Sequence, residues 1–518
     1  MTADTDVQPL RGAQLLMATL LLGLANFMVV LDSTIANVSV PHIAGSLAVS
    51  PSQGTWVITS YNVAEAITVP LTGWLAQRFG PVRVFAFAMA GFGVFSMLCG
   101  LAPSFAMLVA FRVAQGFCGG PIMPMSQTLL LHIFPRNRAP QAMGLWSMTT
   151  VVAPIAGPIL GGLISDNIHW SWIFFINIPV AAFVGIFGYR ALIAHDTPTR
   201  RIKVDGVGLE LLVVWVGALQ IMLDKGKELE WFASPVIITL AVTAAIGFCA
   251  FLIWELTEKN PIVNLRVFRH RGFSVAVVTI SLSFGAFFSS VVVLPLWLQT
   301  SMGYTATWAG YAGCFTGVLA VVMSPVVAGL AQRFDPRYLT FFGVTWMGLI
   351  SLWRTFYTTD VGFWFIAAPQ LALGFGMPFF FIATNTIAMG SVNPEETAAA
   401  SGLSNFLRTT GAAFATSIMT TSWENTASAK RAMLAGELND PAGTVAKMEA
   451  AGFTHTQALA SLERMVQQQG TMLSTTAMFW AAAAVFIFAA ASSGWPRVRA
   501  PARRWAAATK PCHPRAMT

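Results

Sequence analysis

Charged residues are scarce in this chain of 518 residues, where they make up 10% of the sequence while apolar residues make up 55%. An ordinary soluble domain carries roughly 25% charged residues, so this chain lacks the charge to cover a surface that faces water. Its 39 Phe, 23 Met and 17 Trp are bulky apolar residues suited to contact with membrane lipids. The composition therefore excludes an ordinary soluble protein and predicts one embedded in a membrane.

Cysteines and nucleotide-binding motifs are also few or missing. No G-x-x-x-x-G-K-[ST] loop occurs, which excludes an ATP-driven pump with a P-loop. No cluster of His, Cys and acidic residues beside an interfacial pocket is apparent, so we expect neither enzyme activity nor a cofactor. The five cysteines show no metal-type spacing, so we expect neither disulfides nor a metal site; they are Cys99, Cys118, Cys249, Cys314 and Cys512.

Long apolar stretches, by contrast, recur along the whole chain. A helix needs about 20 residues to cross the hydrocarbon of a bilayer, and we count fourteen candidate stretches. The sequence thus predicts an all-α polytopic membrane protein with 14 transmembrane helices, and the even number places both termini on one side. The stretches lie near residues 13–38, 54–76, 83–102, 104–128, 140–164, 170–192, 206–223, 234–254, 273–299, 305–331, 338–357, 361–390, 397–422 and 471–493.

Lysine and arginine are distributed unevenly between the two sides of these stretches. If the N-terminus is cytoplasmic, 21 of them fall in inner segments and 6 in outer segments, with Arg112, Arg354 and Arg408 inside spans. Cytoplasmic loops carry an excess of basic residues, so the bias predicts that both termini are cytoplasmic. It also accounts for the net charge of +8 without a nucleic-acid partner.

One segment of twelve residues occurs twice. Residues 70–81 align without gaps on residues 325–336, with seven identities, and each copy closes a span that runs from outside to inside. Two six-helix halves, with the seventh and eighth spans inserted between them, would give the copies matching positions. Parallel repeats of this kind resemble the architecture of major facilitator transporters.

The chain is thereby divided into five parts, with one long outer loop at 423–470. That loop is polar, contains the helix-breaking segment 439–443, and has an amphipathic second half. The parts are a cytoplasmic N-terminus at 1–12, an N-terminal six-helix bundle at 13–192, two inserted helices with cytoplasmic linkers at 193–272, a C-terminal six-helix bundle at 273–493 that includes the periplasmic loop, and a basic cytoplasmic tail at 494–518.

Several short motifs resemble those of the fourteen-helix drug–proton antiporters of the major facilitator superfamily. They include the family signature at the end of the first span, the loop motif between spans two and three, the motif with a buried arginine in span four and the antiporter motif in span five. The segments are 31–41, 73–83, 112–116, 153–162, 261–265 and 404–408. The resemblance covers nearly the whole chain and is greatest to the EmrB-type inner-membrane subunit of bacterial tripartite pumps.

This resemblance implies a proton-coupled multidrug exporter of the bacterial inner membrane that works by alternating access. It implies lipophilic drugs and protons as transported species, and a periplasmic adaptor and an outer-membrane channel as partners. A dedicated exporter of one metabolite, such as a siderophore or fatty acid, is the alternative on the same fold. A scaffold protein is disfavoured, because it would have no need to bury ionisable side chains.

Three ionisable residues inside predicted spans are the candidates for proton coupling: Asp32, Glu65 and Arg112. A charge near the bilayer centre costs about 2.5–3.5 kcal/mol on insertion scales, and an acid and a base at similar depth offset part of that cost by pairing. We expect Asp32 and Arg112 to pair. A permanent pair that only fixes packing is the alternative interpretation.

Four further polar residues are candidates for substrate contact or gating: Asn37, Gln115, Asn405 and Arg408. Arg408 lies in the middle of the thirteenth stretch, where a structural role is equally compatible with the sequence. We expect Arg354, near the outer end of its span, to extend its side chain to the interface.

Two groups of residues are candidates for conformational motifs. The first lies in the loop motif, where Gln77 replaces the usual acidic residue, and its arginines are either gating residues or only orientation charges; it comprises Gly73, Arg78, Gly80 and Arg83. The second forms a small-residue and proline stripe that either packs against a neighbouring helix or bends during transport. It comprises Pro154, Gly157, Pro158 and Gly161.

Overall fold

All regular secondary structure is helical in the computed structural model, across the residues that it describes: 10, 12–135, 138–197, 199, 202–438 and 440–493. The predicted basic tail and most of the N-terminal segment lie outside these residues, as does Cys512. The helices of the first part are α1 (Gly12–Ser46), α2 (Pro51–Gly54), α3 (Trp56–Thr68), α4 (Thr72–Phe79), α5 (Pro81–Gly100), α6 (Phe105–Gly119), α7 (Ile122–Ile133), α8 (Ala139–Asn167), α9 (Trp172–Phe175) and α10 (Asn177–Leu192), followed by the 3₁₀ turn η2 (Ile193–His195).

The remaining helices continue to residue 493. They are α11 (Gly206–Lys225), η3 (Trp231–Ala233), α12 (Pro235–Thr257), η4 (Leu265–Arg269), α13 (Arg271–Thr300), α14 (Ala306–Arg333), α15 (Pro336–Arg354), α16 (Phe363–Gly390), η5 (Pro394–Glu396), α17 (Thr397–Gly436), α18 (Pro441–Ala450) and α19 (His455–Ser493).

Eleven helical segments in the described part of the chain are long and apolar enough to cross a membrane. The chain is therefore a multi-pass membrane protein. All fourteen apolar stretches fall on helices, but three of them do not meet the same criteria. The second is broken around Pro70 into α3 and α4, each shorter than 18 residues, and α15 and α17 are less apolar over such a length.

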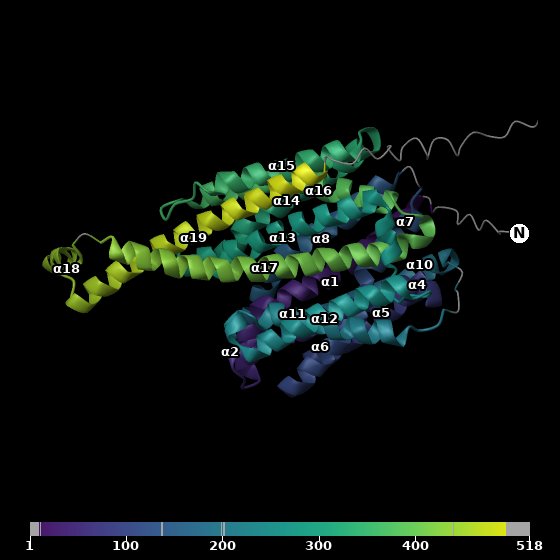
Figure 1. The fold of residues 1–518 in the computed structure, drawn as a ribbon, viewed down its shortest axis with the longest axis horizontal. Coiled ribbons are helices and arrows are strands. Elements are labelled where there is room, and N and C mark those ends of the chain that lie inside the picture. Colours follow the sequence, from purple (N-terminus) through teal and green to yellow (C-terminus); the bar gives the residue numbers. More distant parts are fainter. Residues whose placement is uncertain are drawn as a thin grey trace, which may run out of the picture.

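The helices form two bundles joined by an inserted pair. Within the first bundle, α1 packs on α8, α3 on α6 and α5 on α10; within the second, α13 packs on α17, α14 on α16 and α15 on α19. The bundles meet where α8 contacts α14 and where α4 and α7 contact α17. Of the inserted helices, α11 lies against α3 and α17, and α12 packs on α11. Figure 1 shows the second bundle above the first, with the long axes of the helices nearly parallel.

The repeated twelve-residue segment has the same local structure in both bundles. In each copy a helix ends just before the second proline, which then occupies the first turn of the next helix: α4 ends at Phe79 and α5 begins at Pro81, while α14 ends at Arg333 and α15 begins at Pro336. Ala328 in α14 lies against Gly144 near the start of α8. We call the end of the molecule that carries Arg78, Arg83 and Arg333 the arginine-rich end.

The segment expected to be a polar outer loop, 423–470, is mostly helical. The two flanking helices continue through it, α17 to Gly436 and α19 from His455, and α18 lies between them. Trp423 Nε1 donates to Thr475 Oγ1 at 2.9 Å, so the two long helices are held together where they leave the bundle. Figure 1 shows them extending past the other helices, with α18 at the tip. Low hydropathy indicated a loop, but polar residues form a helix equally well when helices pair.

Candidate functional site

A buried ion pair joins α1 to α6. The side chains of Asp32 and Arg112 are both fully buried, and Arg112 Nη1 lies 2.7 Å from Asp32 Oδ2. Gln115, one turn further along α6, accepts a hydrogen bond from Arg112 Nη1 at 2.8 Å and donates to Asp32 Oδ1 at 3.3 Å. Of the three candidates for proton coupling, the structure thus brings two together, with Gln115 between them.

Two residues not singled out in the sequence complete the surroundings of Asp32. Asn177, at the start of α10, donates to Asp32 Oδ1 at 2.6 Å and to Ser96 Oγ at 3.1 Å. Ser96 on α5 donates in turn to the carbonyl oxygen of Phe174 at 2.8 Å. Asn177 could have been identified from the sequence by its amide among the apolar residues Phe174–Pro179, because a polar side chain within a span needs a partner.

Arg112 also connects this cluster to α3. Its Nε donates to the carbonyl oxygen of Val57 at 3.0 Å, and its guanidinium carbon lies 4.2 Å from the centre of the Tyr61 ring. Its Nη2 has no hydrogen-bond partner among the described residues. Four helices, α1, α3, α6 and α10, therefore meet around one carboxylate and one guanidinium.

Glu65 lies on α3 one turn from Tyr61, and its side chain makes no hydrogen bond or ion pair among the residues that the structure describes. The charges of Asp32, Arg112 and Arg408 nevertheless act on it. Helices α3 and α6 are in close contact beside it, because a methyl group on Gly116 would lie 2.9 Å from Ala64 Cβ. Glu65 is thus a carboxylate without a direct partner in the described part of the chain, within reach of the charges of Arg112 and Arg408.

Arg408 is enclosed by aromatic rings from both bundles. Its guanidinium carbon lies 5.5 Å from the ring centre of Trp146, 5.0 Å from that of Phe284 and 5.6 Å from that of Phe381. Its Nη2 contacts the sulfur of Met123, and its Nε and Nη1 have no partner among the described residues. A 3% exposed guanidinium with two free donors is therefore located at the junction of the two halves.

A second polar cluster crosses the same junction nearer the arginine-rich end. Gln127 on α7 accepts hydrogen bonds from Ser401 Oγ at 2.5 Å and Asn405 Nδ2 at 2.9 Å, both on α17. It donates to Asn385 Oδ1 on α16 at 3.2 Å. The candidate Asn405 thus belongs to a network centred on Gln127, a residue that was not predicted from the sequence. The fourth substrate or gating candidate, Asn37, is exposed on α1 and lies outside both clusters.

The small-residue stripe of α8 packs against α1. A methyl group on Gly157 would lie 2.8 Å from Thr34 Cβ, and one on Gly161 would lie 2.7 Å from a backbone carbonyl oxygen of α1. Both prolines of the motif, Pro154 and Pro158, lie inside α8. The stripe permits the two helix backbones to approach closely.

The glycine that opens the loop motif is located where the bundles touch. A methyl group on Gly73 would lie 2.7 Å from the Cα of Ala399 on α17, and one on Gly402 would lie 2.8 Å from the carbonyl oxygen of Val69. Glycines on α4 and α17 therefore allow the two bundles to come into backbone contact at the arginine-rich end.

The rest of the loop motif contacts the segment after α10. Gly80 has φ +89°, a conformation that favours glycine, and Asp196 lies directly against it. Arg83 Nε lies 3.6 Å from Asp196 Oδ2, and Arg78 Nη1 donates to the carbonyl oxygen of Ile202. The two arginines thus bind the linker that leads to the inserted helices.

Arg354 does not reach the membrane interface, and our expectation for it was wrong. It is 1% exposed, and its Nη2 donates to Gln370 Oε1 on α16 at 2.5 Å. The phenyl ring of Phe479 lies 5.5 Å from its guanidinium. Gln370 on the neighbouring helix α16 thus provides one hydrogen-bond partner for this arginine inside the protein, and position within a span does not reveal such a partner.

Comparison with known proteins agrees with this architecture. A model of the Major Facilitator Superfamily matches residues 22–416. The solved structure of the proton:xylose symporter XylE superposes with a TM-score of 0.56 at 12% sequence identity, covering 92% of this chain and 95% of that one. A likeness at so low an identity concerns the fold alone, and it confirms the predicted major facilitator fold.

Curated relatives are much more similar in sequence. The chain is 46% identical to the multidrug export protein EmrB of Escherichia coli (strain K12) over 93% of its own length and 95% of that protein's. It is 43% identical to the fatty acid resistance protein FarB of Neisseria gonorrhoeae, over 93% of its own length and 96% of that protein's. The family predicted from the motifs is confirmed: the chain belongs to the major facilitator superfamily of transporters, and within it to the family of EmrB-type export proteins.

Proposed function

We propose that the chain is a proton-coupled multidrug exporter in which Asp32 carries the transported proton. The observation that carries the proposal is the ion pair of Asp32 and Arg112, fully buried in a network of polar side chains from four helices. The 46% identity to a multidrug export protein supports the choice of substrates. A secondary transporter needs one ionisable group whose proton affinity changes with conformation, and this pair meets that need.

The chemistry follows from the partners of the carboxylate. While Arg112 and Asn177 donate to Asp32, the charged form is stabilised; if helix movement separates them, burial without partners favours the protonated acid. Protonation in turn weakens the attraction to Arg112, so the proton must bias the conformation by the same free energy. Rocking of the two bundles would then couple proton entry to drug release.

Glu65 and Arg408 are proposed to face the transported compound. Among the residues that the structure describes, Glu65 has no direct partner, and Arg408 has two free donor atoms inside an aromatic enclosure built by both halves. Gln115 connects Asp32 to Arg112, while Asn405 contributes to the contact that must separate when the halves part. Apolar and aromatic walls with a few polar groups suit lipophilic substrates.

The membrane topology is part of the proposal. We propose fourteen spans, with α3–α4, α15 and α17 added to the eleven strongly apolar segments, and both termini in the cytoplasm. The two bundles support an even count, because each then contains six spans around one inserted pair. The arginine-rich end would face the cytoplasm, in agreement with the excess of basic residues there.

A periplasmic adaptor and an outer-membrane channel are the proposed partners in the bacterial inner membrane. The supporting observation is the helical hairpin formed by α17, α18 and α19, which extends beyond the other helices at the end opposite the arginines (Figure 1). A projection of paired helices offers a surface for another protein outside the bilayer.

A dedicated exporter of one metabolite is the second candidate. The 43% identity to a fatty acid resistance protein supports it, since that relative is named for resistance to a single compound class. A dedicated exporter would protect an efflux-deficient host against one class of compound only, whereas a multidrug exporter would protect it against several.

Drug-induced proton release from purified protein in detergent tests the role of Asp32. Wild type should release protons when a substrate binds, and Asp32→Asn, which mimics the protonated acid, should release markedly fewer while still binding substrate. Asp166→Asn is the matched control, because the side chain of Asp166 is 66% exposed and pairs with His42 rather than with Arg112. A folded Asp32→Asn protein that releases as many protons as wild type would show that another group carries the proton.

A further inference from the structure

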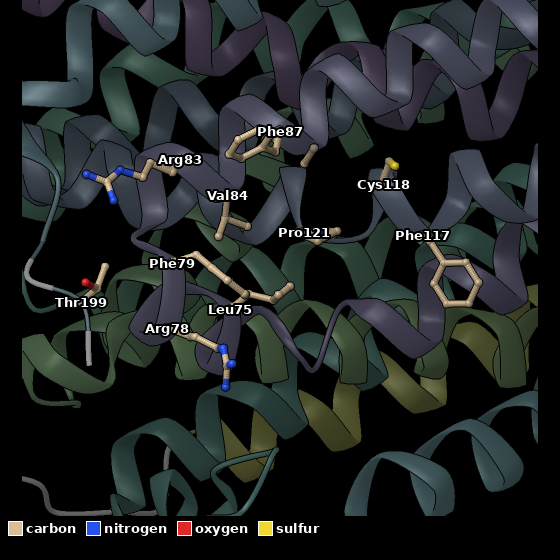
Figure 2. A pocket seen from close by; sticks show the side chains of 11 residues that line it. Leu75, Arg78, Phe79, Arg83, Val84, Phe87, Phe117, Cys118, Pro121 and Thr199 are labelled. Atoms are coloured by element: carbon tan, nitrogen blue, oxygen red, sulfur yellow. The ribbon is translucent and has the colours of Figure 1, made fainter. Parts of the chain in front are cut away.

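An open groove with a volume of about 600 Å³ runs along the first bundle beside the loop motif. Helices α4 and α5 and the junction of α6 and α7 form its walls, chiefly through the apolar residues Leu75, Phe79, Val84, Phe87 and Phe117. Figure 2 shows Arg83 and Thr199 at one end of the groove and Phe117 at the other, with Arg78 beside Phe79. The groove therefore has a long apolar part and a polar end.

The apolar part faces outward from the bundle. Phe87 is 77% exposed and Phe117 is 43% exposed, and both belong to segments that are apolar enough to cross a membrane. Phe87 lies six residues into α5, about 9 Å along the helix axis from its start. These rings are therefore in contact with hydrocarbon rather than water, and the hollow between them fits an acyl chain.

The polar end carries two cations and one acid that is already engaged. Asp196 has a 10% exposed side chain, lies 3.6 Å from Arg83 Nε and accepts the backbone N–H of Val82 at 3.1 Å. Arg83 itself is 55% exposed, and its two Nη atoms make no hydrogen bond within the described part of the chain. The guanidinium of Arg78 rests on the ring of Trp74, 5.2 Å from its centre. Donors on Arg83 thus remain available to an anion.

We propose that this groove binds one anionic phospholipid, with its phosphate at Arg83 and Thr199 and an acyl chain along Phe79, Phe87 and Phe117. Basic pockets between helices at the membrane surface bind anionic head groups, and the apolar walls require a ligand that carries a hydrocarbon chain as well as the charge. Because Arg83 and Asp196 hold the linker to the inserted helices, the lipid lies against a junction between the parts of the molecule. The inference does not depend on which compounds the protein exports.

Native mass spectrometry of the full-length protein in detergent tests the site, with phosphatidylglycerol and phosphatidylethanolamine as probes. Wild type should retain one phosphatidylglycerol in preference to phosphatidylethanolamine. Arg83→Gln should weaken phosphatidylglycerol binding about fivefold, because each basic residue near the surface contributes about 1 kcal/mol. Arg333→Gln is the control, since Arg333 is an exposed arginine at the same end of the second bundle and does not line the groove, and it should bind as wild type does.

A second pair of variants tests the apolar wall. Phe87→Ser should lower the occupancy by phosphatidylglycerol with both arginines intact, whereas Phe488→Ser, at a 66% exposed phenylalanine of α19, should not. Both positions are exposed, so the variants should remain folded. The proposal is overturned if wild type binds the two lipids equally, or if each groove variant binds phosphatidylglycerol no more weakly than its control.

Discussion

Arg112 and Asp32 illustrate why a buried charge is informative only together with its partners. Removing one member of a buried pair leaves the other uncompensated, at a cost of about 3–5 kcal/mol. Arg112→Ala would therefore impair folding as well as coupling, while Asp32→Asn retains a side chain that Gln115 and Asn177 can still contact. For this reason the neutral amide at Asp32 is the more interpretable variant.

Glu65 differs from Asp32, because no side chain among the described residues neutralises it directly. A carboxylate that faces a cavity of low dielectric constant attracts cationic compounds. We therefore predict that Glu65→Gln lowers resistance to lipophilic cations more than resistance to neutral drugs, measured as growth of an efflux-deficient host across a panel of both classes.

Glu255→Gln is the control for this experiment. Glu255 is 1% exposed on the inserted helix α12, where it accepts the N–H of Val263 at 3.3 Å, so the variant should change neither class selectively. Equal losses for cationic and neutral drugs in Glu65→Gln would instead indicate a role in folding or proton coupling.

Among whole elements, the hairpin of α17, α18 and α19 is the one that differs most from its sequence-based expectation. Its two long helices are joined at their bases through Trp423 and Thr475, and further out by the ion pair of Arg431 and Glu463 at 2.7 Å. Helix α18 contributes Val445 to a small buried contact. The hairpin therefore has contacts of its own, in addition to the hydrogen bonds that join Gln468 to Ser301 and Gln469 to Thr359.

Replacing residues 437–454 by a short Gly/Ser linker removes α18 and leaves α17 and α19 intact. We predict that drug-dependent proton transport in proteoliposomes stays near wild type, while crosslinking to the proposed periplasmic adaptor falls severalfold. The same replacement of residues 227–230, in the loop between α11 and α12, is the comparison. Unchanged crosslinking after removal of α18 would show that the adaptor binds elsewhere.

On the scale of the whole molecule, the orientation follows from the positions of the basic residues. The 21-to-6 distribution of Lys and Arg predicts that residue 440 is periplasmic and residue 510 cytoplasmic. Alkaline phosphatase fused after residue 440 should be active, and fused after residue 510 or after Asp335 it should be inactive. The opposite pattern would reverse the proposed topology.

The sequence predicted the helical membrane fold well, because apolar length and basic loops act locally along the chain. Every apolar stretch lies on a helix, and the repeated segment ends equivalent helices in both bundles. Packing partners were harder to predict. Asp32 and Arg112 could be matched by depth, but the roles of Asn177 and Gln127 depend on which helices adjoin, and neither spacing nor composition encodes that.

The expectations for Arg354 and for the segment 423–470 were wrong for a related physical reason. A polar residue or segment near the edge of a span can be solvated by water or satisfied by protein, and the sequence alone favours water. Gln370 and the pairing of α17 with α19 provide the protein alternative. Whether a polar group near the end of a span is buried in the protein therefore has to be determined from the structure.

Helix α17 is a single rod of 40 residues without an internal proline, about 60 Å long. Near one end Gly402 and Ala399 touch α4, Arg408 lies further along at the junction of the bundles, and the other end reaches α18. The length from Arg408 to Gly436 is about 42 Å, so a tilt of α17 about the junction at Arg408 would move its far end through a longer distance than the end beside α4. A tilt that opened the contact with α4 would move the tip of the hairpin sideways in the opposite direction. A protein bound at the tip would then be moved once in each transport cycle.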